Sequence, residues 1–493
     1  MQWEDTLTSR ASGEATVNAA WASTDFAAGA PTTIAIIGGG FSGALTAVGI
    51  LRGARPGNSR VLLVDNGSGF GRGLAYRHAE PELVLNVPAG NMSALRDQPD
   101  HFVKFLQRVD PRFNEGSFVP RTLYGEYVQQ TLAEAERACP DTLTRHDGEA
   151  IALQLEHEPT RYRIDFADGR VVYAQRVVLA TGHFAPDLPS CFPRNVAHRV
   201  LRAWDHDAAD ALDPAAPVAV MGMGHTGIDT LLRLVRLCPE RKVFMFSRRG
   251  LVPHTHRPKP VMPARVGYPE GFASLAPTIR AYEKSLRASI AQRVAGGEDW
   301  RDVLNELRPH TSSLWRSLPY EERARFLRRL LPYWDIHRHR LAPAVGDRFR
   351  HLLETGRVER IAGAVVDAHE RDGMLHVDLR TRAGATTRTL EVSAVINCTG
   401  PNYDLTKVSL PLIKQLLHAG HIRRDRLGLG LDVDDEYRVI GANGQPAHDL
   451  FYVGPMLRAR YWEAVAVPEL RQHAAALAEK LVHDLACVAR EAT

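Results

Sequence analysis

Two stretches of this chain repeat one order of hydrophobic and polar positions. Each starts with a short β-branched or apolar run, passes through a glycine-rich turn, continues with apolar residues at helical spacing and ends in a second apolar run. This order predicts strand, turn, helix and strand, which is the opening of a parallel βαβ unit. The segments are 34–37, 44–51 and 60–65 in the first copy and 218–221, 228–237 and 242–247 in the second.

The repetition extends to the end of each half. An apolar strand ending in Thr-Gly closes the first half at 176–182 and the second at 393–400. Before each lies a stretch of alternating residues that predicts a hairpin, around 162–172 and 375–389. Two nested copies of one plan predict a two-dinucleotide oxidoreductase.

Two further segments break this pattern. Between about 270 and 345 the sequence is rich in Arg and Leu, and it predicts a helical insertion that is too long for a simple connection. Residues 1–30 lack periodicity, so we expect a flexible extension outside the core. Its aromatic residues leave docking onto the body open; they are Trp3, Trp21 and Phe26.

Composition narrows the class of protein. The 493 residues carry a net charge of only +4 without a basic tract, so we expect no nucleic-acid partner. The 5 cysteines form no C-x-x-C pair, which argues against a dithiol site, a disulfide scaffold and a metal cluster. No secretory leader and no run of about 18 apolar residues is visible, so we expect a cytoplasmic protein without a membrane span.

The first glycine turn has the spacing G-x-G-x-x-G. Such glycines permit a tight turn and close approach to a pyrophosphate, which the N–H groups of the next helix then face. An acid at the end of the following strand can accept hydrogen bonds from ribose hydroxyls. The alternative is a purely structural turn. The residues expected at this dinucleotide site are Gly38, Gly40, Phe41, Ser42, Gly43, Asp65 and Asn66.

The second turn repeats the spacing but ends differently. Its strand closes on Ser247-Arg248-Arg249 instead of an acid, and arginines attract the 2′-phosphate of NADPH. We therefore expect NADPH rather than NADH. The alternative is that these arginines are only a solvent-exposed strand end, where arginine is common. His225 lines the nicotinamide side or is merely tolerated in the turn. The residues expected here are Gly222, Gly224, His225, Thr226, Gly227, Ser247, Arg248 and Arg249.

The C-terminal region predicts one more element near a cofactor. A strand at 450–455 ends in Gly-Pro, and Pro468 marks the start of a helix. A helix N-terminus beside a flavin would stabilise negative charge on its reduced ring. A simple core helix is the alternative.

These motifs together resemble a known family. The chain is similar to bacterial FAD/NAD(P)-binding proteins that are distant relatives of the class B-type, two-Rossmann flavin monooxygenases. The resemblance covers nearly the whole chain after residue 30. It is carried by IAIIGGGFSG at 34–43, GRGLAY at 71–76, LNVPAGNMSA at 85–94, FVPRTLYGEYV at 118–128, ATGH at 180–183, MGMGHTGID at 221–229, SRRG at 247–250, PYWDIHRHRLAP at 332–343, NCTG at 397–400 and the run from GP to PELR at 454–471.

The resemblance implies FAD at the first turn and names further contacts. Thr181 and Gly182 would lie at the domain junction. A Baeyer–Villiger fingerprint is only echoed by Phe192 and His198, so we expect no such activity. The other implied FAD contacts are Gly73, Ala75, Tyr76, Asn86, Met92, Ser93 and Arg121, with Gly454, Pro455, Trp462 and Glu463 closing over the flavin.

The expected fold class is α/β with two Rossmann-like dinucleotide-binding domains, for FAD and NAD(P)H, the second inserted in the first. The expected bounds are 31–210 and 346–493 for the FAD-binding domain and 211–345 for the NAD(P)H-binding domain, including the helical insertion at about 270–345.

The expected activity is an FAD-dependent, NADPH-using monooxygenase. It would use O₂ to hydroxylate a small-molecule substrate, an amine, a sulfur or an activated carbon, through a C4a-hydroperoxyflavin. A flavin-dependent reductase with another electron acceptor and a non-catalytic FAD-binding redox sensor are the alternatives. The candidate substrate or catalytic cluster, for which a structural ion-pair cluster is the alternative, is His337, Arg338, His339 and Arg340, beside Trp334 and Asp335.

Overall fold

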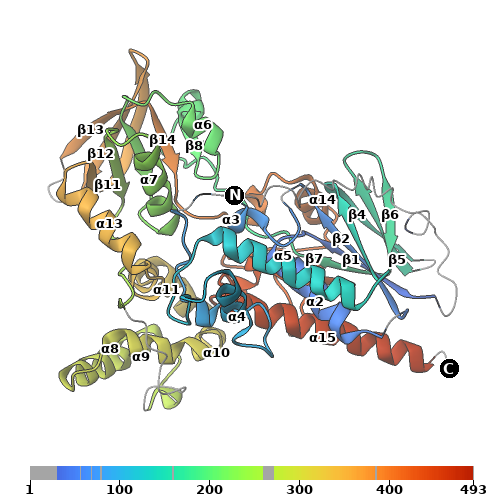
Figure 1. Ribbon diagram of the computed structural model, residues 1–493. Coiled ribbons are helices and arrows are strands. Elements are labelled where there is room, and N and C mark those ends of the chain that lie inside the picture. The colour runs from blue at the N-terminus through green and yellow to red at the C-terminus, as the bar shows by residue number, and fades with distance from the viewer. Residues whose placement is uncertain are drawn as a thin grey trace.

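The chain forms two α/β domains side by side, with a group of helices below the second in the view of Figure 1. The computed structural model describes residues 21, 30–55, 57–67, 69–77, 80, 82–157, 160–258, 271–382 and 386–491. The prediction of two Rossmann-like domains, the second inserted in the first, is confirmed by the sheets. Within the described residues, no helix is both long and apolar enough to cross a bilayer.

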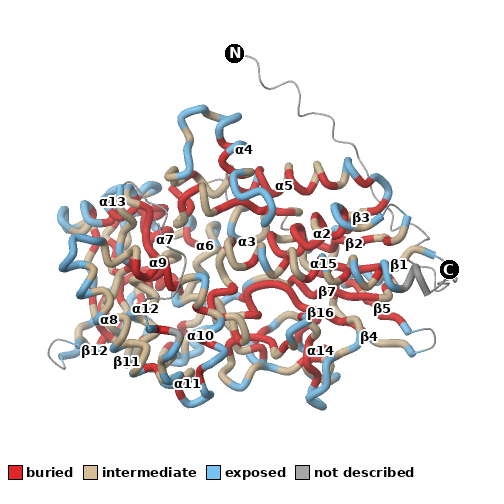
Figure 2. Tube along the Cα trace, turned by 90° about the horizontal axis from the view of Figure 1, so that it is seen from below, coloured by how far each residue is buried: buried red, intermediate tan, exposed pale blue. Residues whose placement is uncertain are grey.

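The first domain is built on a six-stranded sheet of order β15-β16-β7-β1-β2-β3. All neighbours are parallel except β15 and β16, which pair antiparallel. Both faces are covered, which explains why β1 and β7 consist almost wholly of buried apolar residues (Figure 2). The strands are β1 (Thr32–Ile37), β2 (Ser59–Asp65), β3 (Leu143–Asp147), β7 (Arg176–Leu179), β15 (Arg438–Ile440) and β16 (Pro446–Tyr452).

Helices α2, α5 and α15 pack together on one face of this sheet (Figure 1). A small antiparallel sheet of β4, β5 and β6 lies beside helix α14, whose Gln415 bonds both backbone groups of Leu153 at 3.1 Å. The remaining elements of this domain are α2 (Phe41–Gly53), α3 (Gly73–Tyr76), η1 (Ala89–Asn91), α4 (His101–Val109), α5 (Arg121–Ala138), β4 (Ala150–His157), β5 (Thr160–Phe166), β6 (Val171–Ala174), η5 (Leu405–Lys407), α14 (Pro411–His418), η6 (Pro455–Ala459) and α15 (Val467–Glu491).

The second domain has a seven-stranded sheet of order β13-β12-β11-β10-β9-β14-β8. Strands β8 to β11 and β14 are parallel, and β11, β12 and β13 form an antiparallel meander. Its elements are η2 (Arg194–Arg199), β8 (Val200–Arg202), α6 (His206–Asp210), β9 (Val218–Met221), α7 (His225–Leu237), β10 (Val243–Ser247), α13 (Pro343–Glu354), β11 (Val358–Arg371), β12 (Met374–Thr381), β13 (Thr387–Val392) and β14 (Ala394–Asn397).

The bounds expected for the two domains need correction at both edges. The second sheet begins with β8 and ends with β14, so it takes in 200–397 rather than 211–345. Strand β14 pairs with β9 just as β7 pairs with β1 in the first domain. The expected closing strand of the second copy is therefore confirmed, and the expected return to the first domain at 346 is wrong.

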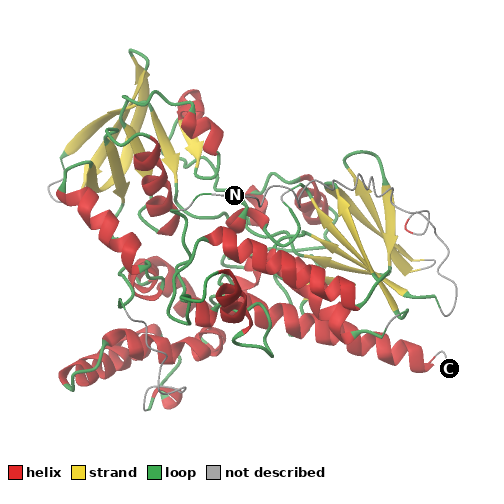
Figure 3. Cartoon of the chain, viewed as in Figure 1, coloured by secondary structure: helices red, strands yellow, loops and turns green. Residues whose placement is uncertain are grey.

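The helical insertion is confirmed between β10 and β11 (Figure 3). It packs against the C-terminal part of the first domain, where Trp315 stacks on Trp462 with ring centroids 4.5 Å apart. Trp315 also donates from its indole nitrogen to the Ala459 carbonyl at 2.9 Å. Its elements are η3 (Phe272–Ser274), α8 (Ile279–Ala295), α9 (Trp300–Leu307), η4 (Arg308–His310), α10 (Thr311–Ser317), α11 (Tyr320–Arg329) and α12 (Leu331–Arg338).

One residue of the N-terminal extension belongs to the core. Trp21 is 1% exposed, joins the first domain's apolar cluster and donates to the Thr144 hydroxyl at 3.3 Å. The Arg60 guanidinium lies 5.0 Å from its ring centroid. The expectation that 1–30 stays outside the core is wrong at Trp21, while Trp3 and Phe26 lie outside the described residues.

Candidate cofactor-binding site

An open cavity of about 1490 Å³ lies where the two domains meet. Its walls come from both glycine turns, the C-terminal segment of the first domain and the helical insertion. A cavity of this size can hold large ligands, since pockets for drug-sized molecules span roughly 300–1,000 Å³. Both predicted dinucleotide sites therefore open into one space.

The outer glycines of each turn are required by the protein itself. Gly38 and Gly222 have φ of +119° and +110°, and an added Cβ would lie 2.2 and 2.3 Å from a carbonyl oxygen of the neighbouring strand end. Gly43 and Gly227 pack so closely that a Cβ would lie 1.9 and 2.2 Å from the carbonyl of the turn's first glycine. These four positions explain the close helix–strand packing of both turns.

The middle glycines have no such internal reason. Gly224 has an ordinary φ of −79°, and a Cβ there would meet nothing within 4 Å. Gly40 has φ of −68°, and a Cβ there would only touch Gly73 at 3.5 Å. Both line the cavity. A bare backbone facing an open space suits the close approach of a pyrophosphate, so the residues present fit two dinucleotides.

Three helix N-termini converge on the same cavity. Helix α2 begins at Phe41, α7 at His225 and α15 at Val467, and all three residues line the space. The first N–H groups of a helix lack partners inside the helix and carry the positive end of its dipole. The cavity is thereby suited to phosphate groups and to negative charge on a bound ring.

The two strand ends beside the turns differ. The Asp65 carboxylate is 4% exposed and accepts a hydrogen bond from the Gly69 N–H at 2.8 Å. Ser247, Arg248 and Arg249 line the cavity, and no described carboxylate lies within 4.0 Å of either guanidinium. Two arginine side chains without a described carboxylate partner therefore line the cavity beside the second glycine turn.

Buried ion pairs join the domains at the wall of the cavity. Arg121 of α5 pairs with Asp229 of α7 at 2.6 Å, with side chains only 13% and 9% exposed. Glu80 accepts from Arg233 at 2.6 Å and lies 2.9 Å from His206. Breaking a buried pair leaves an uncompensated charge. Arg121, expected along FAD, thus also fixes the position of the second domain.

The C-terminal segment is held by the insertion. Glu463 has a positive φ of 68° and is 2% exposed. Its carboxylate accepts from Arg338 at 2.8 Å and from the Trp334 indole at 3.2 Å. A left-handed non-glycine residue costs about 1–3 kcal/mol, so these bonds stabilise a strained backbone at the cavity wall.

The polar cluster at 335–340 divides into different roles. Arg338 is the partner of Glu463, as the structural alternative predicts. His337 lies against His254 with ring centroids 4.6 Å apart. It lines neither this cavity nor a second one between the first domain and the helical insertion. His339 lines both cavities and Arg340 only the second.

Burial sets the protonation of the side chains around the cavity. It lowers the pKa of His183 to about 4 and of His225 to about 4, with Arg458 and Arg121 adding to the effect. Burial raises the pKa of Asp335 to about 6 against the opposing effect of Arg458. The cavity therefore holds neutral histidines and one carboxyl that titrates near neutral pH.

The structure places the expected site residues in two groups. Those that line the cavity are Gly40, Phe41, Ser42, Gly73, Ala75, Tyr76, Asn86, Met92, Arg121, Gly182, Gly224, His225, Thr226, Ser247, Arg248, Arg249, Pro455, Trp462 and Glu463. Those that do not are Gly38, Gly43, Asp65, Asn66, Ser93, Thr181, Gly222, Gly227 and Gly454.

Sequence reasoning missed Arg458. Its guanidinium lies 4.3 Å from the Trp462 ring centroid and 4.9 Å from that of Tyr403, and all three line the cavity. It stands in the quoted run at 454–471, but nothing in its spacing singles it out. Of the echoed Baeyer–Villiger residues, Phe192 is buried in the second domain's core and His198 pairs with Glu370 at the surface.

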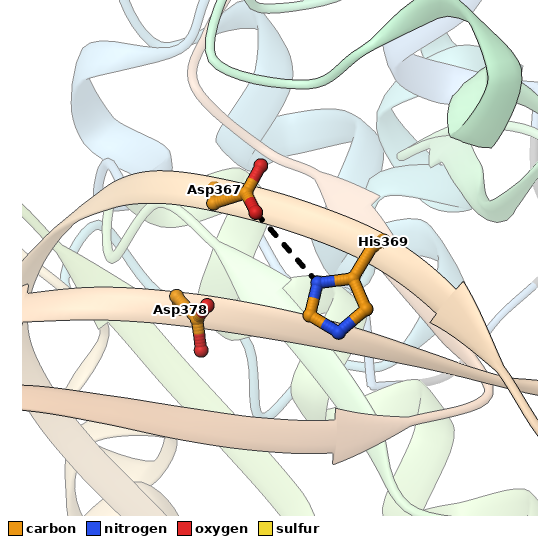
Figure 4. A group of neighbouring side chains, drawn as sticks. All are labelled: Asp367, His369 and Asp378. Atoms are coloured by element: carbon orange, nitrogen blue, oxygen red, sulfur yellow. Dashed lines mark ion pairs between the residues drawn. The ribbon is translucent and has the colours of Figure 1, made fainter.

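A group with metal-ligand chemistry lies elsewhere. Asp367 and His369 on β11 and Asp378 on β12 bring their ligand atoms within 4.8 Å of one another (Figure 4). Asp367 and His369 are exposed and 3.7 Å apart, and Asp378 accepts from the Thr389 hydroxyl at 2.5 Å. None of the three borders the cavity.

Comparison with known proteins agrees with the two-domain architecture. Residues 35–184 match the model of a family described as FAD-NAD(P)-binding, and no curated protein matches the chain. Among solved structures, ornithine hydroxylase (PvdA) from Pseudomonas aeruginosa has a TM-score of 0.64 at 15% identity, over 92% of this chain and 100% of that one.

Two further structures are similar over the same length. L-lysine 6-monooxygenase from Pseudomonas syringae has a TM-score of 0.63 at 17% identity, over 93% of this chain and 99% of that one. Ornithine N-hydroxylase KtzI from Kutzneria sp. 744, with FADred, NADP+ and L-orn, has a TM-score of 0.58 at 16% identity, over 92% and 100%. The chain thus contains an FAD-NAD(P)-binding domain and shares its overall fold with these monooxygenases.

Proposed function

We propose that this protein is an FAD-dependent, NADPH-using monooxygenase that hydroxylates a small molecule. The observation that carries the proposal is that both glycine turns, each followed by a helix N-terminus, open into one cavity. Two dinucleotides bound at these turns would share one space, as hydride transfer requires, because its partners must come into near contact. Among the similar structures, the ornithine N-hydroxylase with FADred and NADP+ supports this assignment of cofactors.

The backbone of this chain does the binding. The N–H groups at the start of α2 would hold the FAD pyrophosphate, and those of α7 would hold that of NADPH. Arg248 and Arg249 would bind the 2′-phosphate, because charge-assisted hydrogen bonds are the strong ones. The N-terminus of α15 would stabilise negative charge on the reduced flavin. When bound, FAD supplies hydride acceptance and O₂ activation.

Other residues exclude water and move a proton. The Arg458 guanidinium lies close to the rings of both Trp462 and Tyr403 at the cavity wall, and this bulky group would help to keep bulk water from the site. The Asp335 carboxyl lines the cavity and has a pKa of about 6, so it could hold a proton for transfer within the site.

Spectroscopy of the purified chain tests the proposal. The protein should carry releasable FAD, and NADPH should bleach the flavin band under anaerobic conditions. With ¹⁸O₂ and a substrate found by coupled NADPH loss, one labelled oxygen should enter the product. A colourless protein that rejects FAD contradicts the proposal, and flavin reduction with no labelled product identifies a reductase instead.

A further inference from the structure

A second cavity, of about 1280 Å³, lies between the first domain and the helical insertion. One wall comes from segments around 86–91 and 100–117, and the other from 256–258, 301–309 and 338–340. Four residues line both this cavity and the cofactor cavity, so the two spaces share a wall. They are Asn86, Val87, His339 and Ala466.

Most arginines of this second cavity have a carboxylate partner. Arg308 bonds Glu469 through two nitrogens at 2.6 and 2.8 Å. Arg338 bonds Glu463 at 2.8 Å. Two more arginines of the insertion wall each have an acid nearby. Arg257 lies 2.5 Å from Asp302, and Arg301 lies 3.2 Å from Asp299.

Arg340 is the exception. It is 3% exposed, its Nη2 donates to the Asn305 side-chain oxygen, and its buried Nε has no hydrogen-bond partner. Among the residues that the structure describes, no carboxylate lies within 4.0 Å of this guanidinium. Among the described residues of this wall, three arginines, at 257, 301 and 340, thus face two acids, which leaves one guanidinium without a carboxylate partner.

The surroundings of Arg340 agree with this imbalance. Burial, together with the charges of Arg338, Arg301 and Arg257, lowers the pKa of Arg340 to about 10 against the opposing effect of Asp299. His256 is kept neutral by burial, with a pKa of about 3, and its Nε2 lies 3.1 Å from the Asn86 carbonyl oxygen. On the far wall Lys104 pairs with Asp100 at 2.6 Å.

The far wall also carries Glu115, which is exposed. Its carboxylate is not within 4.0 Å of the Arg340 guanidinium, so Glu115 does not balance the charge of Arg340. A buried guanidinium without a carboxylate is costly unless something else supplies the negative charge.

We propose that the second cavity binds the carboxylate of a small-molecule acid at Arg340, and that this acid is the substrate of the reaction. The second half of this statement rests on the proposed function. A carboxylate carries one negative charge, which equals the excess on this wall, whereas a phosphate monoester carries about two at pH 7. The planar guanidinium also matches a carboxylate in geometry. The shared wall puts the rest of the acid beside the cofactor cavity.

A pair of substitutions separates a ligand-binding role from a structural one. Arg340→Met should raise the Tm of the purified, FAD-loaded protein by about 1–2 °C, because it removes a buried charge without a partner. Arg338→Met, the matched control, should lower Tm, because it strands Glu463. A fall in Tm for Arg340→Met equal to that of Arg338→Met would mean that Arg340 is a structural residue and would overturn the proposal.

Simple anions test the ligand class directly. Butyrate, a monocarboxylate, should raise the Tm of the wild-type protein by about 2 °C over sodium chloride of equal ionic strength, with no such rise in Arg340→Met. Sulfate, a dianion, should give a smaller rise than butyrate. Equal rises in both proteins, or a larger effect of sulfate at Arg340, would contradict a carboxylate site.

These measurements need no turnover, so they are independent of the proposed function. If the protein proves to be a reductase, butyrate should still bind at Arg340. In a screen scored by NADPH loss, acids should be turned over at least tenfold more efficiently than their amides. A good substrate without an acid group would overturn the substrate assignment while leaving the binding site intact.

Discussion

The two glycine turns of this molecule have nearly the same backbone but different surroundings. Gly38 and Gly222 share a positive φ and the same close contact with a carbonyl of the neighbouring strand end. The strands that follow end in contrasting ways, since Asp65 bonds its own loop while Arg248 and Arg249 face the cavity. The shape of each turn is therefore set by contacts inside the protein, and we expect the choice of nucleotide to be set at the end of the strand that follows.

The largest expected effect separates the first from the middle glycine of a turn. Gly222→Ala should lower the free energy of unfolding by roughly 2–5 kcal/mol, because it adds a left-handed alanine and a steric clash. Gly224→Ala should change it by less than about 0.5 kcal/mol and weaken NADPH binding at least about tenfold. Chemical denaturation and NADPH titration measure the two effects.

The same pair in the first turn is the control. Gly38→Ala should destabilise like Gly222→Ala, and Gly40→Ala should weaken FAD retention while NADPH affinity stays the same. Unchanged binding in both middle-glycine variants would show that the open space beside them is not where the pyrophosphates lie.

An intermediate effect is expected at the strand end. Replacing Arg248 and Arg249 together by Glu should lower kcat/KM for NADPH by about 100-fold or more, because two charge-assisted hydrogen bonds are lost and each is worth about 1.5–3 kcal/mol. Activity with NADH should not fall. Steady-state kinetics with both coenzymes decides, and Asp65→Asn is the control that should leave the coenzyme preference unaltered. An equal loss with both coenzymes would argue for a general structural role of these arginines.

The smallest effect concerns the residue directly after the middle glycine of each turn. This residue is Phe41 in the first turn and His225 in the second. The His225 pKa is about 4 in the folded protein, against an ordinary value near 6.5. Below pH 6.5 His225 takes up a proton in the unfolded chain but not in the folded chain. The free energy of unfolding therefore decreases as the pH falls from 6.5 toward 4. The variant His225→Phe has no such group, so it lacks this decrease.

Thermal unfolding between pH 4.5 and 8 measures the difference. The Tm of wild type minus that of His225→Phe should be constant above about pH 7 and decrease below about pH 6.5. A difference that does not vary with pH would show that His225 becomes protonated in the folded protein at its ordinary pKa.

Much of the fold could be predicted because its determinants are local in the sequence. The spacing of Gly38, Gly40 and Gly43, together with the apolar runs on either side, predicts strand, turn and helix without knowledge of distant contacts. The same holds for the second copy and for the helices of the insertion. The cavity-facing position of Arg248 and Arg249 follows from their place at a strand end.

The rest depends on contacts between distant residues. The sequence places the end of the second domain at 345, which is wrong, because a hairpin followed by a closing strand looks alike in both halves of the sequence. Only the pairing of β14 with β9 shows that this hairpin and closing strand belong to the second sheet. Arg458 was missed because its partners, Tyr403 and Trp462, come from other segments. Trp21 was placed outside the core because its burial depends on Thr144 and Arg60, far along the chain.

The insertion of one domain into the other has a consequence for biosynthesis. Strand β7 finds its neighbour β16 through the pairing of Val177 with Leu450, so the first sheet stays incomplete until the ribosome has delivered almost the entire polypeptide. The second sheet, whose strands all lie between these two, can assemble earlier. Such long-range closure is slow and leaves an unpaired edge exposed to aggregation meanwhile. Nascent chains that stop short of β16 should therefore be the ones that recruit chaperones.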